Sequence, residues 1–67
     1  MRPWAVTERQ RQVLALRAKG LTIDEIAEEL WVSRWTVMCH LKEINRALAA
    51  RNSTHAVAIG YQTGMLT

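Results

Sequence analysis

The sequence predicts an all-α fold, a small four-helix bundle that contains a helix-turn-helix. The chain has 67 residues, enough for one domain with a single apolar core and little beyond three or four helices. Apolar residues recur at helical spacing, and no segment shows the alternation typical of a strand. Residues that cap helix N-termini precede these apolar segments. The predicted helices cover residues 8–19, 23–30, 34–49 and 54–64.

The first two helices each begin with the pattern of a capping box, in which a hydroxyl and a side chain three residues later satisfy backbone donors. Thr7 with Gln10 forms the first such pair, and Thr22 with Glu25 forms the second. Gly20 tolerates the left-handed conformation that ends the first helix. Inward-facing positions are expected at Val13, Leu14, Leu16, Ala18, Ile26, Ala27 and Leu30.

The third helix follows the second after a very short turn. Ser33 is its expected N-cap, and the turn before it holds only Trp31 and Val32. Two helices joined this closely must cross steeply, which is the geometry of a helix-turn-helix. At 100° per residue, one narrow arc of the third helix collects Val37, Leu41, Ile44 and Leu48. This arc is the predicted core side.

Either Asn52 or Ser53 can cap the fourth predicted helix. Its packing positions are expected at Ala56, Val57 and either Ile59 or Gly60. Trp4, ahead of the first helix, is expected to cover the first or the fourth helix. No repeat, low-complexity tract or linker interrupts the sequence, so residues 1–67 are expected to form a single domain.

The opposite face of the third helix has an unusual composition. A merely solvated face carries mostly Glu, Lys and Gln, so exposed Trp and Met there indicate a contact surface. The second helix of a helix-turn-helix enters the major groove of DNA. There Lys and Arg donate to guanine, while apolar side chains contact thymine methyls and sugars. We therefore expect base contacts from Trp35, Met38, Cys39, Lys42 and Arg46.

Contacts with DNA phosphates are expected at the ends of the same helix. The candidates at the start of this helix are Arg34, the Thr36 hydroxyl and the free backbone N–H groups. The candidate beyond the end of the helix is Arg51. For Trp35 two interpretations are open, because exposed tryptophan is as typical of protein interfaces as of DNA-binding faces.

The charge is unevenly distributed along the chain. The net charge is +3, which mildly favours a polyanionic partner. Residues 20–32 carry four carboxylates and no Lys or Arg, whereas residues 33–51 carry four cations against Glu43 alone. Two solvated helix faces and nucleic-acid binding both explain this pattern.

The residue types favour binding over catalysis. Cys39 is the only cysteine, which excludes an internal disulfide and a thiolate zinc cluster. His40 has no second ligand at zinc spacing and is expected to pack. No nucleophile–base pair or phosphate loop is visible, so we expect no enzyme activity, catalytic residue, metal or cofactor. No apolar run reaches bilayer length and no secretion signal precedes the domain, so a cytoplasmic protein without a membrane partner is expected.

Two long segments carry a resemblance to a known family. TERQRQVLALRAKGLTIDEIAEELWVSRWTVMCHLKEINRAL, followed by ARNSTHAVA, resembles the LuxR-type DNA-binding domain, also called the GerE or NarL/FixJ type. The similarity covers roughly residues 6–64, and its parts are specific in combination. It implies a four-helix bundle in which the second and third helices form the DNA-binding motif.

The resemblance also implies roles for single residues. The base-contacting positions of the family fall on Met38, Cys39 and Lys42, the phosphate-binding threonine on Thr36, and the packed histidine on His40. The fourth helix often supplies a homodimer contact in this family. Candidate interface positions here are Ala56, Ile59, Gly60 and Thr63.

Departures from the family pattern concern charge near the phosphates. The family commonly has Glu-Gly where this chain has Arg34 and Trp35, and a lysine where it has Met38. Asp24 stands at a position that is frequently basic or polar. Fewer charged contacts imply weaker nonspecific DNA binding or a different partner, although Arg34 can compensate for the missing lysine.

Most family members carry an N-terminal receiver or ligand-binding domain. The chain shows no separate regulatory domain, which leaves an excised fragment or a stand-alone small regulator. The segment MRPWA is typical of a natural start and favours the stand-alone regulator.

Two functions from different classes follow. The first is a transcription regulator that binds double-stranded DNA sequence-specifically as a homodimer, with the helix over 33–48 in the major groove. The second starts from ERQRQVLALR, which also resembles region 4 of sigma factors. In that alternative Trp31, Trp35 and the acidic second helix bind RNA polymerase or another regulator. The fourth helix at RNSTHAVA argues against it, because region 4 lacks that helix.

Overall fold

The computed structural model describes residues 5–67 and confirms the all-α prediction for this range. Its helices are α1 (Glu8–Ala18), α2 (Ile23–Leu30), α3 (Arg34–Leu48) and α4 (Ser53–Gln62). Helices α1, α3 and α4 depart from the predicted ranges by one or two residues at their ends. Trp4 lies outside the described residues.

The two predicted capping boxes are both present. Thr7 Oγ1 accepts from the N–H of Gln10, and Gln10 Oε1 accepts from the N–H of Thr7, each at 3.1 Å. The same exchange joins Thr22 to Glu25 at 3.2 and 2.9 Å. These bonds satisfy backbone donors that a helix start leaves free, so α1 and α2 begin at the predicted residues.

Single caps start the other two helices. Ser33 Oγ accepts from the N–H of Thr36 at 3.1 Å, as the sequence predicts for α3. At α4 the cap is Asn52 and not Ser53, because Asn52 Oδ1 accepts from the N–H of His55 at 2.8 Å. Each predicted helix therefore has a local side-chain bond that fixes its start.

Left-handed residues follow all four helices, and the one after α4 is Gly64 with φ +79°. Gly20 has φ +96°, which matches its predicted role. The other two are not glycine: Trp31 ends α2 with φ +58° and Ala49 ends α3 with φ +55°. Outside glycine this conformation costs about 1–2 kcal/mol, so the turn of the helix-turn-helix holds some backbone strain at Trp31.

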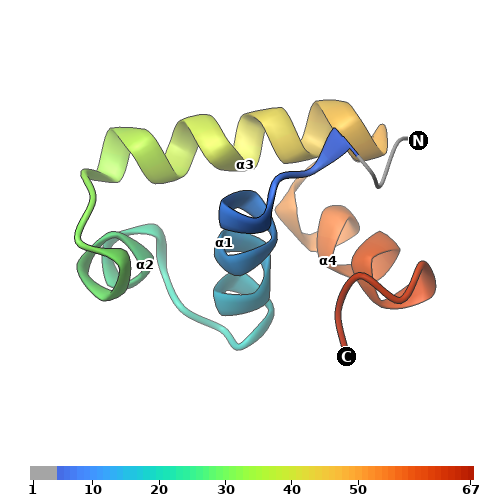
Figure 1. Ribbon diagram of the computed structural model, residues 1–67, viewed down its shortest axis with the longest axis horizontal. Helices are drawn as coiled ribbons and strands as arrows, with labels where there is room; N and C mark the ends of the chain where they lie inside the picture. Colours follow the sequence, from blue (N-terminus) through green and yellow to red (C-terminus); the bar gives the residue numbers. More distant parts are fainter. Residues whose placement is uncertain (1–4) are drawn as a thin grey trace.

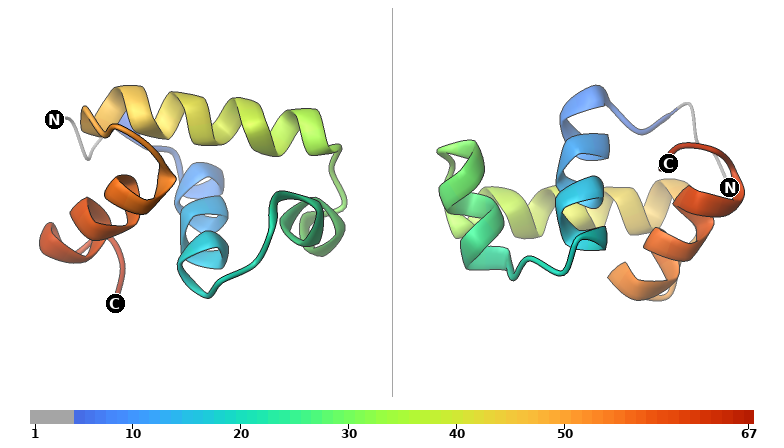
Figure 2. Two further views of the ribbon diagram at one scale, coloured as in Figure 1. Left: turned by 180° about the vertical axis from the view of Figure 1, so that it is seen from behind. Right: turned by 90° about the horizontal axis from the view of Figure 1, so that it is seen from below.

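Helix α3 is the longest element and lies across the other helices, as Figure 1 shows. It packs against α1, α2 and α4, while α1 also packs against α2 and α4. Figure 2 shows α1 crossing α3 steeply, with α2 and α4 at opposite ends of α3. One side of α3 thus faces the bundle along its whole length, and the other side is uncovered.

All four helices contribute to one apolar core. The fully buried large side chains are Leu14, Ile26, Ile44, Leu48, Val13 and Val37. Of the predicted inward positions, Leu16, Ala18 and Leu30 are only partly buried and pack at the edge of this core. Leu66, which was not among the predicted core residues, joins the core after α4 has ended. Its N–H donates to the Gly60 carbonyl at 2.9 Å, which folds the tail back onto α4.

Three of the four positions predicted at a homodimer interface lie inside this core, which corrects that assignment. Ala56 is 0 % exposed, Ile59 is 7 % exposed, and Gly60 is buried. A Cβ placed on Gly60 would come within 2.9 Å of the Leu66 side chain. These residues hold α4 against its own chain and are not available to a second copy. Only Thr63 is exposed.

Candidate nucleic-acid interface

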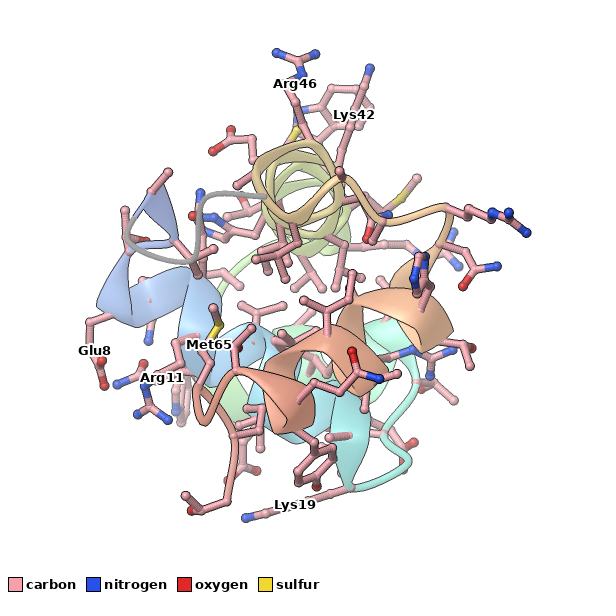
Figure 3. The ribbon with its side chains drawn as sticks, turned by 90° about the vertical axis from the view of Figure 1, so that its right-hand side faces the viewer. Glu8, Arg11, Lys19, Lys42, Arg46 and Met65 are labelled. Atoms are coloured by element: carbon pink, nitrogen blue, oxygen red, sulfur yellow. The ribbon has the colours of Figure 1, made fainter. Side chains whose placement is uncertain are left out.

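The outward face of α3 is formed by the residues opposite its buried arc. Val37, Leu41, Ile44 and Leu48 are all buried, as predicted. Lys42 and Arg46 are exposed, and Figure 3 shows both side chains pointing away from the bundle, on the side opposite Lys19. Trp35 is 71 % exposed and Met38 is 42 % exposed, so the uncovered side of α3 combines cations with large apolar groups.

Cys39 is less prominent than its neighbours on this face. It is only partly exposed, although its helical position is nearly opposite Val37. Longer side chains stand one turn away on either side of it, Trp35 before and Glu43 after. The thiol is therefore less accessible than the longer side chains around it.

One border of the face is fixed by a contact with α1. Gln10 Nε2 donates to Glu43 Oε2 at 2.6 Å, and Gln10 is only 6 % exposed. The same Gln10 closes the capping box of α1, so its amide joins the start of α1 to the middle of α3. This bond orients the carboxylate of Glu43 toward α1. This bond was not predicted, because no local pattern signals a pair 33 positions apart.

The N-terminal turn of α3 brings together two of the predicted phosphate-binding residues. Arg34 Nε donates to Asp24 Oδ1 of α2 at 2.9 Å. The Thr36 hydroxyl is 3.0 Å from Ser33 Oγ, which also accepts from the N–H of Thr36. In the described range no protein acceptor bonds to the N–H groups of Arg34 and Trp35, so these donors are available to an anion.

A groove runs along the flank of α3 from the start of α2 to the start of α4. It is lined by Ile23, Met38, Leu41, Lys42, Asn45, Arg51, Asn52 and Ser53, none of which is acidic. The predicted contacts Met38, Lys42 and Arg51 are thus brought onto one surface. The Arg51 N–H donates to His55 Nδ1 at 3.1 Å, which fixes the backbone while its guanidinium remains exposed.

Two buried polar atoms lie on α3 without a bonding partner among the described residues. They are Asn45 Oδ1, in a side chain that lines the groove, and His40 Nδ1. His40, which was predicted to pack, is partly buried. Neither atom was predicted to lack a partner, because the hydrogen bonds of a buried polar group depend on the whole fold.

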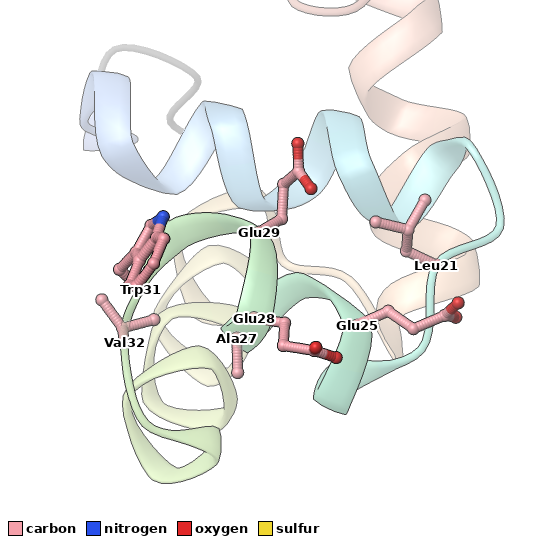
Figure 4. Close-up of a pocket in the computed structure, with 7 residues that line it drawn as sticks. All are labelled: Leu21, Glu25, Ala27, Glu28, Glu29, Trp31 and Val32. Atoms are coloured by element: carbon pink, nitrogen blue, oxygen red, sulfur yellow. The ribbon is translucent and has the colours of Figure 1, made fainter.

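A second surface, with the opposite charge, lies on α2. Figure 4 shows Glu25, Glu28, Glu29 and Trp31 around a groove beside α2. Trp31 is 94 % exposed. Carboxylates repel phosphates, so this acidic surface does not suit DNA, and the α3 face is the better nucleic-acid interface. No helix in residues 5–67 combines the length and apolar character needed to cross a bilayer.

Comparison with known proteins identifies one family. Residues 5–59 match the model of the bacterial regulatory proteins of the luxR family. Over 62 residues the chain is 44% identical to the transcriptional regulatory protein YdfI of Bacillus subtilis. This aligned segment covers 92% of the chain and 29% of that relative. Over 61 residues it is 38% identical to VjbR of Brucella ovis, a quorum sensing-dependent transcriptional regulator, which covers 91% of the chain and 24% of the relative. The chain thus spans less than a third of these relatives.

Proposed function

The chain belongs to the luxR family of bacterial regulatory proteins, and from this premise we propose that it binds double-stranded DNA sequence-specifically to regulate transcription in the cytoplasm. The family is one of transcription regulators and not of enzymes. The observation that carries the proposal is the exposure of Lys42 and Arg46 on the uncovered side of α3. A helix that protrudes in this way fits the major groove, where two cations meet the acceptors of guanine.

The side chains of α3 divide into two roles. Lys42 and Arg46 donate to base edges, while Trp35 and Met38 contact thymine methyls and sugars. Cys39 is less exposed than Trp35 and Met38, and its small thiol suits contact with a thymine methyl. The phosphates on either side are held by Arg34, Thr36 and Arg51 together with the free N–H groups at the start of α3.

The homodimer is proposed to form through the exposed face of α4. Thr54, Ala58 and Tyr61 are exposed and share one side of this helix by their spacing. Tyr61 is 52 % exposed, and an aromatic side chain of this size is a common anchor of protein interfaces. Two copies joined in this way would bind half-sites about one helical turn (~34 Å) apart. We expect Tyr61→Ala to lower the fraction of DNA-bound protein that is dimeric, as measured by sedimentation.

The sigma region 4 alternative, with RNA polymerase or another regulator as the partner, is not favoured. The family match extends to residue 59, deep into α4, and region 4 lacks this helix. Trp31 and the acidic carboxylates beside it remain exposed in the structure, but exposure alone does not identify a protein partner.

The test is selection of bound duplexes from a random pool at two salt concentrations. We expect a consensus with two half-sites. The slope of log affinity against log salt concentration should give the number of phosphate contacts. Against this consensus Lys42→Ala and Arg46→Ala should each lose about 1–3 kcal/mol of binding free energy. Lys19→Ala is the matched control, because it removes one exposed cation on the opposite side. Equal affinity of the wild type for the consensus and for a scrambled duplex would contradict the proposal.

A further inference from the structure

An ion pair joins the first turns of the two motif helices. Asp24 stands in the first turn of α2, and Arg34 is the first residue of α3. Arg34 Nε is 2.9 Å from Asp24 Oδ1, and the two side chains are 64% and 71% exposed. In the described part of the chain Asp24 is the only hydrogen-bond partner of the Arg34 guanidinium, so its two terminal amino groups are free.

This pair contributes little to folding. Both groups are largely in water, where an ion pair adds little to stability and is screened by salt. The strong bonds that start α2 and α3 come from Thr22 with Glu25 and from Ser33. Folding stability therefore does not explain why Asp24 lies beside Arg34 at the start of the proposed DNA-binding helix.

The position of Asp24 suggests that reason. Arg34 presents the planar guanidinium that binds phosphate with two parallel donors. Asp24 lies within hydrogen-bond distance of this group, so it meets the same phosphates and repels them. In the free protein it also neutralises the charge that would attract DNA of any sequence.

We propose that Asp24 is a specificity-determining residue, which weakens binding to unrelated DNA by restraining and neutralising Arg34. The proposal rests on the proposed function of α3. On a correct site the base contacts of α3 hold a phosphate close to the terminal amino groups of Arg34 while Nε stays bonded to Asp24. On other sequences no base contact fixes a phosphate at the terminal amino groups of Arg34, so phosphates also approach Asp24 and its repulsion costs more than on the correct site.

The same helix offers a matched control. Glu28 is also an exposed carboxylate of α2, but it lines the groove near Trp31 and has no ion-pair partner in the described range. Asp24→Asn and Glu28→Gln remove the same charge from the same helix. A difference between the two variants therefore reports the contact with Arg34 and not the net charge of the protein.

The experiment measures the affinity of wild type, Asp24→Asn and Glu28→Gln for a random-sequence duplex and for the selected consensus over a series of salt concentrations. We expect Asp24→Asn to bind the random duplex about threefold to tenfold more tightly than wild type. Its log affinity should also fall more steeply with log salt concentration, by an amount equivalent to about one more phosphate contact. The affinity for the consensus should rise less, so the ratio between the two should fall. Glu28→Gln should stay within about twofold of wild type in each measurement.

A second background tests whether Arg34 transmits the effect. In Arg34→Ala the same Asp24→Asn change should have less than half of its effect on the random duplex, because the two residues are coupled. Equal changes in Asp24→Asn and Glu28→Gln, or weaker random-duplex binding by Asp24→Asn, would overturn the inference while DNA binding by the wild type stands. A wild type that does not prefer its consensus would instead remove the proposed function itself.

Discussion

The two sides of α3 differ in burial and composition although they share one helix of 15 residues. On the inward side Val37 and Ile44 are 0 % exposed and hold the bundle together. On the outward side Lys42 and Arg46 are exposed, and Trp35 is 71 % exposed. The difference teaches where each property should reside: we expect substitutions on the inward side to change stability, and substitutions on the outward side to change the proposed DNA binding.

Truncation on the inward side should have the largest effect. Ile44→Ala removes a fully buried side chain and leaves a cavity, so we expect the free energy of unfolding to fall by about 2–5 kcal/mol in urea titrations. For a chain of 67 residues this loss is a large share of the total stability. A loss below about 1 kcal/mol would show that the inward side is not the core of the fold.

Truncation on the outward side should lower DNA affinity and leave stability unchanged. The double variant of Lys42→Ala and Arg46→Ala is expected to lose most specific DNA affinity, at about 1–3 kcal/mol for each base contact. Its free energy of unfolding should stay within about 0.5 kcal/mol of wild type, because both side chains are exposed. A variant that unfolds more easily and binds DNA normally would reverse the assignment of the two sides.

Trp31 sharpens the comparison, because it is an exposed residue whose backbone is strained. Its φ of +58° suits glycine, and its side chain is 94 % exposed. We expect Trp31→Gly to raise the midpoint of thermal unfolding, with a gain of about 0.5–1 kcal/mol in unfolding free energy. Ala49→Gly, which has φ +55° at the end of α3, is the control and should also gain stability. A loss of stability in Trp31→Gly alone would mean that the indole supports the fold.

The smallest effect is expected away from α3, at the start of α1. The hydrogen bond from the Arg11 guanidinium lowers the pKa of Glu8 below the ordinary value of a glutamate. A folded-state pKa that is lowered adds stability above the unfolded pKa of about 4.3, and this contribution is lost as the pH falls through the folded pKa. In urea titrations below pH 5, the free energy of unfolding of Glu8→Gln should decrease slightly less steeply with falling pH than that of wild type. An unchanged pH profile would mean that the pair does not persist in solution.

The sequence predicted what depends on local spacing. Two capping boxes and the Ser33 cap were correct because each needs only neighbours along the chain. The inward arc of α3 was correct because helical periodicity alone places it.

The sequence did not predict what depends on how helices dock. The bond from Gln10 to Glu43 and the return of Leu66 onto α4 join distant segments, and no local pattern reports them. The dimer positions were wrong for the same reason: Ala56 and Ile59 lie on the side of α4 that packs against its own chain. Residues of an outward face can be named from periodicity, but their hydrogen-bond partners cannot.

The central claim is that the outward face of α3 lies against DNA, and Cys39 offers the most direct measurement of it. This residue is the only cysteine and lies on that face, so its alkylation by iodoacetamide reports one position. With saturating consensus duplex we expect the alkylation rate to fall by about tenfold or more, because only unbound protein reacts. An unchanged rate, at a duplex concentration where fluorescence anisotropy shows full binding, would contradict the account.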